Sequence, residues 1–233
     1  MSVRYRTSRP MNTSRTKADF QWARSVQERI RDEVITEDRY GRFPDLRFVA
    51  GLDVSVRRSS RLARAATAVF RYPEMILVES SVATCPIDFP YVPGFLSFRE
   101  LPALIEALAA LRTRPQMLLC DGQGLAHPRR CGLACHVGVE TGIPSIGVAK
   151  SRLTGAFESV PTKQGEWTAL TDPRQGGEVI GAVVRTRAGV KPIFVSVGHR
   201  ISLPSAIRIT LGCVTRYRLP ETTRAADRLA AWG

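Results

Sequence analysis

The sequence predicts an α/β fold in which helices flank a mixed β-sheet. Three strand-like runs joined by short turns indicate an antiparallel meander in the first half of the chain. A strand, a glycine-rich loop, a helix and a second strand follow between residues 117 and 149, which indicates parallel pairing. The chain has 233 residues, of which 44% are hydrophobic, and this is enough to bury a substantial core.

The first half opens with apolar residues at three-to-four spacing, which predict an amphipathic helix over residues 18–35. Runs rich in apolar and β-branched residues predict the strands of the meander at 46–56, 65–72 and 75–84. A second apolar stripe predicts a helix over 97–111, and Ser97-Phe98-Arg99-Glu100 at its start is a capping-box pattern.

The second half begins with a short apolar strand at 117–120, a small-residue helix at 131–141 and a strand at 145–149. The remaining predicted elements are strands at 179–185 and 193–197 and helices at 204–214 and 222–231. This order of elements is that of a ribonuclease-H-like architecture.

The first eighteen residues carry five basic side chains and no acidic one, with several Ser and Thr. We expect a disordered basic tail over residues 1–18 and a single domain over 19–233. A similar composition occurs in organelle transit peptides, which stays open as an alternative.

Lys and Arg number 34 against 21 acidic residues, a formal net charge of +13. Such a balance favours a polyanionic partner such as nucleic acid, although charge alone does not separate a nuclease from a passive binder or a membrane-surface protein. No run approaches the roughly 20 apolar residues of a membrane-spanning helix, so we expect a soluble, cytoplasmic protein.

Five cysteines, an odd number, favour a reducing compartment. Cys131 and Cys135 lie near His127 and His136, which suggests zinc, but the paired Cys-x-x-Cys blocks of structural zinc sites are missing. We expect small buried thiols.

Two carboxylates stand at the apolar strands. Asp53 lies within one of these strands and Asp121 ends another. Each alone could cap a turn or pair with an arginine. Together on neighbouring strands they would repel each other, and a divalent cation that prefers oxygen ligands, Mg²⁺ or Mn²⁺, would relieve that repulsion. Glu100 could be a third ligand or the capping residue of its helix, and its spacing does not decide between them.

The loop after Asp121 combines glycines with basic side chains. Gly122 permits close approach of a ligand to the backbone, while His127 and Arg129–Arg130 supply donors suited to phosphate. Lys150 follows an apolar strand, so it lies at a carboxyl end, where open α/β sheets bind ligands.

The segment Pro90-Tyr91-Val92-Pro93-Gly94 is stiffened by two prolines and holds an aromatic residue between them. Such a tip can enter a duplex as a wedge that unstacks bases. The alternative is a plain turn whose Tyr91 packs on the core.

Four segments, Ala50–Asp53, Pro90–Glu100, Asp121–Arg129 and Ile146–Lys150, resemble the endonuclease V family. The resemblance runs from roughly Asp19 to Asp227. It implies a ribonuclease-H-like fold and a magnesium-dependent monomeric nuclease, with Mn²⁺ as a substitute, that acts in DNA repair. Such an enzyme recognises inosine and cuts the second phosphodiester bond on its 3′ side.

The resemblance also implies roles for individual residues. It makes Asp53, Glu100 and Asp121 metal ligands, and assigns Tyr91 to a wedge and Lys150 to the scissile phosphate. The main chain around Gly122 and the tip residues Pro93, Gly94 and Leu96 would read the flipped base.

The family's closing Pro-Glu-Pro-Thr-Arg appears here as Pro220-Glu221-Thr222-Thr223-Arg224, and Asp227 stands where some relatives carry a histidine. Asp227 is therefore a candidate fourth ligand. Two alternatives to DNA cleavage stay open: an inosine-specific endoribonuclease, since some relatives prefer RNA, and a catalytically inactive nucleic-acid-binding relative.

Overall fold

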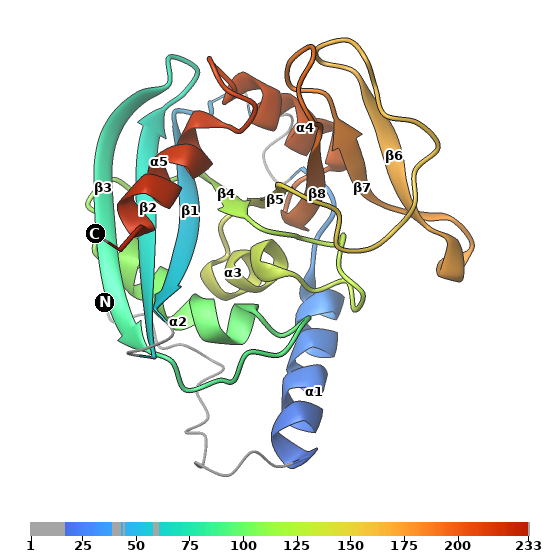
Figure 1. The fold of residues 1–233 in the computed structure, drawn as a ribbon. Helices are drawn as coiled ribbons and strands as arrows, with labels where there is room; N and C mark the ends of the chain where they lie inside the picture. The colour runs from blue at the N-terminus through green and yellow to red at the C-terminus, as the bar shows by residue number, and fades with distance from the viewer. Residues whose placement is uncertain (1–16, 39–42, 44, 58–60, 233) are drawn as a thin grey trace.

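The computed structural model describes residues 17–38, 43, 45–57 and 61–232, and residues 1–16 of the expected tail lie outside this range. Within the described range, the strands form one sheet in the order β3-β2-β1-β4-β5-β8-β7-β6 (Figure 1). The strands are β1 (Phe48–Arg57), β2 (Leu62–Arg71), β3 (Ile76–Pro86), β4 (Met117–Asp121), β5 (Ser145–Ala149), β6 (Trp167–Asp172), β7 (Glu178–Val184) and β8 (Ile193–His199).

The pairing confirms the predicted mixed sheet. Strands β1, β2 and β3 form the antiparallel meander, and β1, β4 and β5 are parallel neighbours. Strand β8 then runs antiparallel to β5, and β7 and β6 continue that half of the sheet in antiparallel fashion. The helices are α1 (Lys17–Glu33), α2 (Ser97–Ala109), α3 (Leu133–Thr141), α4 (Leu203–Gly212) and α5 (Glu221–Ala230), with a 3₁₀ turn η1 at Pro173–Gln175.

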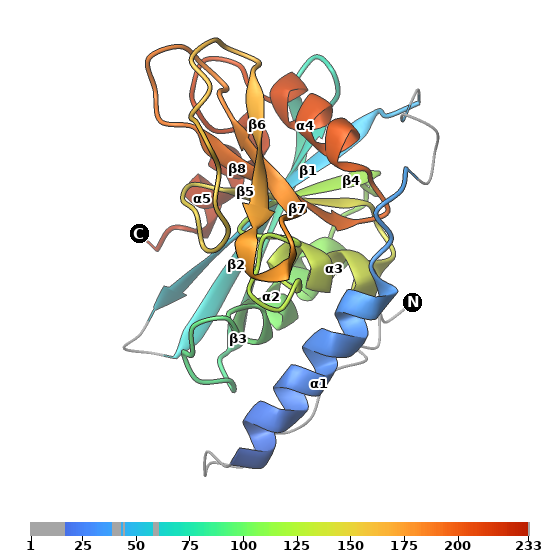
Figure 2. The same cartoon turned by 90° about the vertical axis from the view of Figure 1, so that its right-hand side faces the viewer.

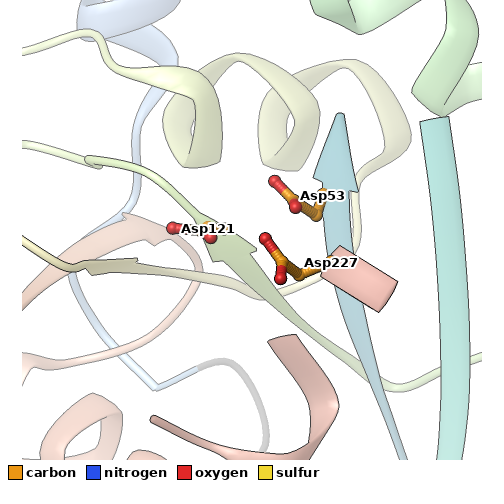
Figure 3. A group of neighbouring side chains, drawn as sticks. All are labelled: Asp53, Asp121 and Asp227. Carbon is orange, nitrogen blue, oxygen red and sulfur yellow. The ribbon is translucent and has the colours of Figure 1, made fainter. Parts of the chain in front are cut away.

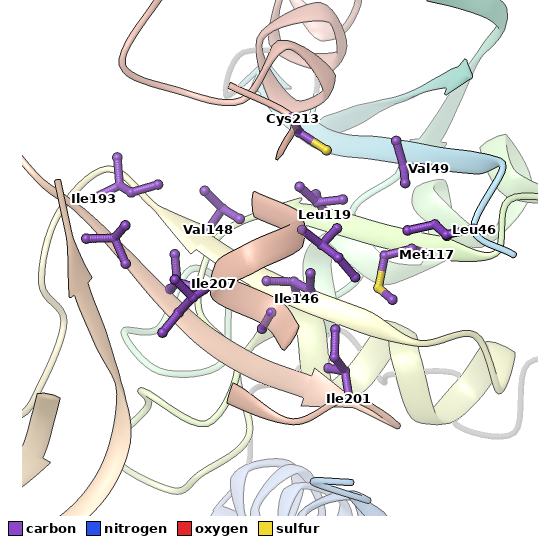
Figure 4. Packing of buried hydrophobic residues seen from close by; sticks show 14 of the residues in the cluster. Leu46, Val49, Met117, Leu119, Ile146, Val148, Ile193, Ile201, Ile207 and Cys213 are labelled. Atoms are coloured by element: carbon purple, nitrogen blue, oxygen red, sulfur yellow. The ribbon is translucent and has the colours of Figure 1, made fainter. Parts of the chain in front are cut away.

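The two faces of the sheet carry separate apolar layers, because side chains alternate along a strand. Leu52 of β1 and Leu118 of β4 face α2 and α3. Val49 and Leu119, from the same two strands, face α4 and α5, as Figure 4 shows for this second layer. Helix α1 lies outside both layers and packs beside α3 (Figure 2).

Among the described strands, β6 is the one that the sequence did not predict. It is an edge strand with few buried side chains, so its apolar pattern is weak. Helix α1 begins at Lys17, so the described chain is already helical at the end of the expected tail. None of the described helices combines the length and apolar character needed to cross a membrane.

Gly51 sets how closely α5 approaches the sheet. A Cβ at this position would overlap the main-chain carbonyl of Thr222, at the start of α5. The missing side chain therefore allows α5 to lie directly on β1, which brings the later turns of α5 close to Asp53.

Gly51→Ala is expected to lower the free energy of unfolding by about 2 kcal/mol, because the added methyl group must push α5 off the strand. Urea unfolding measures the change. Ser55→Ala, on the half-buried end of the same strand, is the control and should change stability by less than about 0.5 kcal/mol. Equal stability of Gly51→Ala and the parent protein would contradict the close α5 contact.

Candidate active site

Strand register brings the first two acidic residues together. Leu52 lies opposite Cys120 in the parallel β1–β4 pair, so Asp53 and Asp121 are neighbours at the ends of this pairing. Asp227 reaches the same place from α5. These three residues each offer a carboxylate oxygen, and the three oxygens lie within 4.8 Å of one another (Figure 3).

Glu100 approaches from α2 and is only 7% exposed. It does not cap its helix, because Ser97 is not the capping residue and α2 begins without a side-chain cap. The Ser97 hydroxyl instead lies 3.0 Å from Nδ1 of the buried His136. Glu100 lines a cavity together with Asp121. The capping-box alternative is therefore wrong. Glu100 is not one of the three clustered aspartates, but it lies close enough to Asp53 for their charges to interact.

Burial and mutual repulsion perturb these carboxyl groups. Burial, and next the charge of Asp121, raise the pKa of Asp53 to about 7. Burial, and next the charge of Asp53, raise the pKa of Glu100 to about 8. Burial also raises the pKa of Asp121, although Lys150 opposes this shift. A divalent cation would relieve the repulsion that disfavours ionisation of these acids. Because they offer only oxygen donors, they suit a hard cation such as Mg²⁺ or Mn²⁺.

Lys150 lies just beyond β5, at the strand end where the sequence placed it. Its Nζ is 2.6 Å from Oδ2 of Asp121 and 3.2 Å from Oδ1 of Asp227. The partner of Asp121 is thus this lysine rather than an arginine. The ammonium group and the carboxylates share one edge of the sheet.

A cavity of about 400 Å³ opens beside the acids. Its walls are the tip that carries Tyr91, the loop after Asp121 and the segment that follows Lys150. Tyr91 is 66% exposed, so the alternative in which its ring packs on the core is wrong. The Arg99 guanidinium lies 5.4 Å from the centre of that ring.

The tip is held through the carbonyl of Gly94, a residue with a φ of 82°. This oxygen accepts hydrogen bonds from Gln27 of α1 at 2.8 Å, from Arg129 and from His127. The His127 ring is neutral, since burial and the charge of Arg129 lower its pKa to about 4. Its Nδ1 accepts from the main-chain N–H of Arg129. His127 and Arg129 thus both have partners inside the protein.

One contributor to this arrangement, Gln27, was not found from the sequence, whereas Arg130 was expected there as a donor for phosphate. Gln27 is buried and also accepts a hydrogen bond from Arg129. The only feature of the sequence that could have indicated this role is a polar residue on the apolar face of an amphipathic helix. Arg130 is buried too, and its guanidinium binds Asp172 at 2.9 Å and Glu178 at 2.8 Å. This network fastens the loop after Asp121 to β6 and β7.

The zinc alternative has no support in the structure. All five cysteines are buried and free, and burial raises the pKa of Cys131 to about 12. Among the described residues, the only cluster of potential metal ligands is the group of three aspartates.

Comparison with known proteins identifies the chain. The family model for endonuclease V matches residues 28–228. The chain belongs to the endonuclease V family. Endonuclease V of Roseiflexus castenholzii is 54% identical over 222 residues, which cover 93% of this chain and 96% of that protein.

Solved endonuclease V structures share the fold. The enzyme from Streptomyces avermitilis superposes with a TM-score of 0.84 at 41% identity, covering 93% of this chain and 92% of the other. A Ciona intestinalis endonuclease V, in complex with a 23-mer DNA that contains an inosine followed by a ribo-adenosine, gives a TM-score of 0.83 at 32% identity, with 93% and 97% coverage. The chain is therefore an endonuclease with the fold of its family.

Glu100→Gln is expected to stabilise the protein in the presence of a chelator at alkaline pH. The raised pKa means that the folded state favours the protonated acid. The free energy of unfolding therefore has its full value below pH 4.5, where Glu100 is protonated in both states. It falls as the pH rises through about 8, where the buried group must ionise. The neutral amide avoids that loss, which is about 5 kcal/mol above pH 8.

Thermal unfolding against pH measures the difference, with the exposed Glu74→Gln as the control. The advantage of Glu100→Gln should disappear at acid pH. An advantage that does not depend on pH would contradict a strained, buried carboxylate at this position.

Proposed function

We propose that this endonuclease recognises inosine in DNA and hydrolyses the second phosphodiester bond on the 3′ side of the lesion, as a metal-dependent repair enzyme. The observation that carries the proposal is the convergence of Asp53, Asp121 and Asp227 within 4.8 Å beside the cavity walled by Tyr91. The inosine-containing DNA bound by the Ciona relative supports the choice of substrate.

Asp53, Asp121 and Asp227 would hold a divalent cation, with Glu100 as a further ligand from the opposite side. Magnesium suits this all-oxygen set, and manganese would substitute. Such an ion supplies an activated water and stabilisation of the leaving oxygen. Asp227, which stands where some relatives carry a histidine, keeps the donor set entirely carboxylate.

Lys150 would contact the phosphate at the cut. Burial opposes its charge, but hydrogen bonds and charges from Asp121 and Asp227 outweigh that effect and raise its pKa. The side chain thus stays protonated while it lies between the acids and the cavity. A fixed positive charge here favours the negative charge that develops during phosphoryl transfer.

The flipped base would enter the cavity between the tip and the loop after Asp121. Pro93, Gly94 and Leu96 form one wall and Gly122 lies on another. The main chain of these residues would distinguish hypoxanthine from ordinary bases. The three hydrogen bonds to the Gly94 carbonyl support this role, because they fix the wall before the base arrives. His127 and Arg129 then serve the substrate by holding the tip.

Finer expectations from the sequence also stay proposals. We propose that residues 19–233 act as one domain and that the protein works as a monomer in the cytoplasm. The five free, buried cysteines are compatible with a reducing compartment.

Asp121→Asn is expected to lower the rate at which an inosine-containing strand is nicked with magnesium, by about 1000-fold. The reason is that one of the proposed metal ligands loses its charge. Binding of the same strand should persist in a gel-shift assay. Asp45→Asn, an exposed change at the far end of β1, is the control. Undiminished nicking by Asp121→Asn would rule out the metal role. Tight binding without cleavage by the parent protein in any divalent metal would favour an inactive binding protein.

Tyr91→Ala is expected to reduce the preference for inosine duplex over undamaged duplex about tenfold, because stacking of the ring on the opened strand is lost. Competition binding on the two duplexes measures this preference. Tyr91→Phe retains the ring and should retain most of the preference. Equal losses on both duplexes would contradict the wedge.

A second candidate is cleavage of inosine in RNA. The ribo-adenosine beside the inosine in the Ciona complex shows a ribonucleotide accommodated by a relative. Parallel assays of inosine in single-stranded DNA, duplex DNA and RNA separate the two activities, and a DNA rate at least equal to the RNA rate is expected.

A further inference from the structure

We infer that the loop between α4 and α5, residues 213–220, binds the nucleotides on the 3′ side of the cut. This inference rests on the proposed function, since it requires the cut to lie at the carboxylates. The loop presents three consecutive side chains, Arg216, Tyr217 and Arg218, which we call the loop triplet. Tyr217 is 46% exposed, and Arg216 is exposed as well.

The loop triplet adjoins the acidic group directly. Arg218 donates from Nη2 to the main-chain carbonyl of Lys150 at 3.2 Å. The side chain of Lys150 in turn reaches Asp121, with 2.6 Å between Nζ and Oδ2. A phosphate next to the one held at Lys150 would therefore meet Arg218 within a short distance.

The backbone of this loop is fixed before any ligand binds. The Thr186 hydroxyl donates to the carbonyl of Arg218 at 2.7 Å, and Arg187 donates to the carbonyls of Thr215 and Arg216. The carbonyls are thereby tied to the segment between β7 and β8, while the Arg216 and Tyr217 side chains stay exposed. A preformed surface loses little conformational entropy when it binds a strand.

The orientation of the Tyr217 ring is also fixed. The Arg224 guanidinium lies 3.5 Å from the ring centre, and Arg224 is paired with Glu221 at 2.7 Å. A cation–π pair on the surface could be no more than local packing. However, an exposed aromatic ring flanked by arginines matches the way proteins bind single strands, by stacking on bases and neutralising phosphates.

The positions of the helices set the direction of the strand. Helix α2, whose Ser97 and Glu100 line the cavity, lies on one face of the sheet, whereas α4 and α5 lie on the other (Figure 1). A strand whose flipped base occupies the cavity and whose backbone crosses the carboxylates must continue toward the α4–α5 side. Because the cut lies 3′ of the base, this continuation is the 3′ part of the strand.

The experiment compares two single-stranded inosine DNA substrates with magnesium. One ends at the nucleotide that follows the cut, and the other extends several nucleotides further. The readout is the ratio of kcat/KM on the long substrate to kcat/KM on the short one. For the parent protein we expect a ratio of about ten, the gain from one stacked base. Tyr217→Ala and Arg218→Met should bring the ratio close to one, and Tyr217→Phe should restore it.

Arg114→Met is the matched control. It removes the same charge from an exposed site before β4, at the opposite end of the strands. It should preserve the ratio. Arg218→Met should also lower the log–log salt slope for binding the long substrate by about 0.7, the loss of one phosphate contact on a single strand.

The outcomes separate the inference from the proposed function. If the parent protein cuts inosine DNA but the Tyr217 and Arg218 variants lose the same factor on both substrates, or keep the full ratio, the inference is overturned and the proposed function stands. If the parent protein cuts neither substrate, both are overturned.

Discussion

The repulsion between buried carboxylates is the constraint on which the rest of the site depends. Strand register places Asp53 beside Asp121, and burial makes ionisation of either group unfavourable. Lys150 offsets part of this cost from the end of the next strand. The protein thus keeps its acids close together at the expense of stability, and the proposed cation would offset that cost.

Packing on both faces of the sheet holds these groups in place. Helix α5 brings Asp227 close to Asp53 and Asp121 only because Gly51 leaves room for the first turn of α5 on β1. On the other face of the sheet, apolar contacts fix α2, and this helix holds Glu100 near the ends of the strands. The acids come from strands and helices rather than flexible loops, so their separations are set by the core.

The sequence predicted the parts of this molecule that follow from local pattern. The sequence located Asp53 within one apolar strand and Asp121 at the end of another, and neighbouring strands implied that they meet. Glu100 could not be resolved, because a capping residue and a ligand share the same spacing, and only the contact between Ser97 and His136 separates them. Edge strand β6 lacked a buried face. The contacts of Gln27 join segments far apart in the chain, which no local pattern reveals.

The triple hydrogen bonding of the Gly94 carbonyl couples the first helix to the wall of the proposed base pocket. One of the three donors, Gln27, belongs to α1, which packs outside the two main layers of the core. Peripheral helices open more readily than central strands. Fraying of α1 would therefore release the wall of the base pocket while the carboxylates on the central strands stay assembled. Under the proposed function, an enzyme in that state would retain the capacity to cut but lose its accuracy, so fidelity would be the less robust of its two properties.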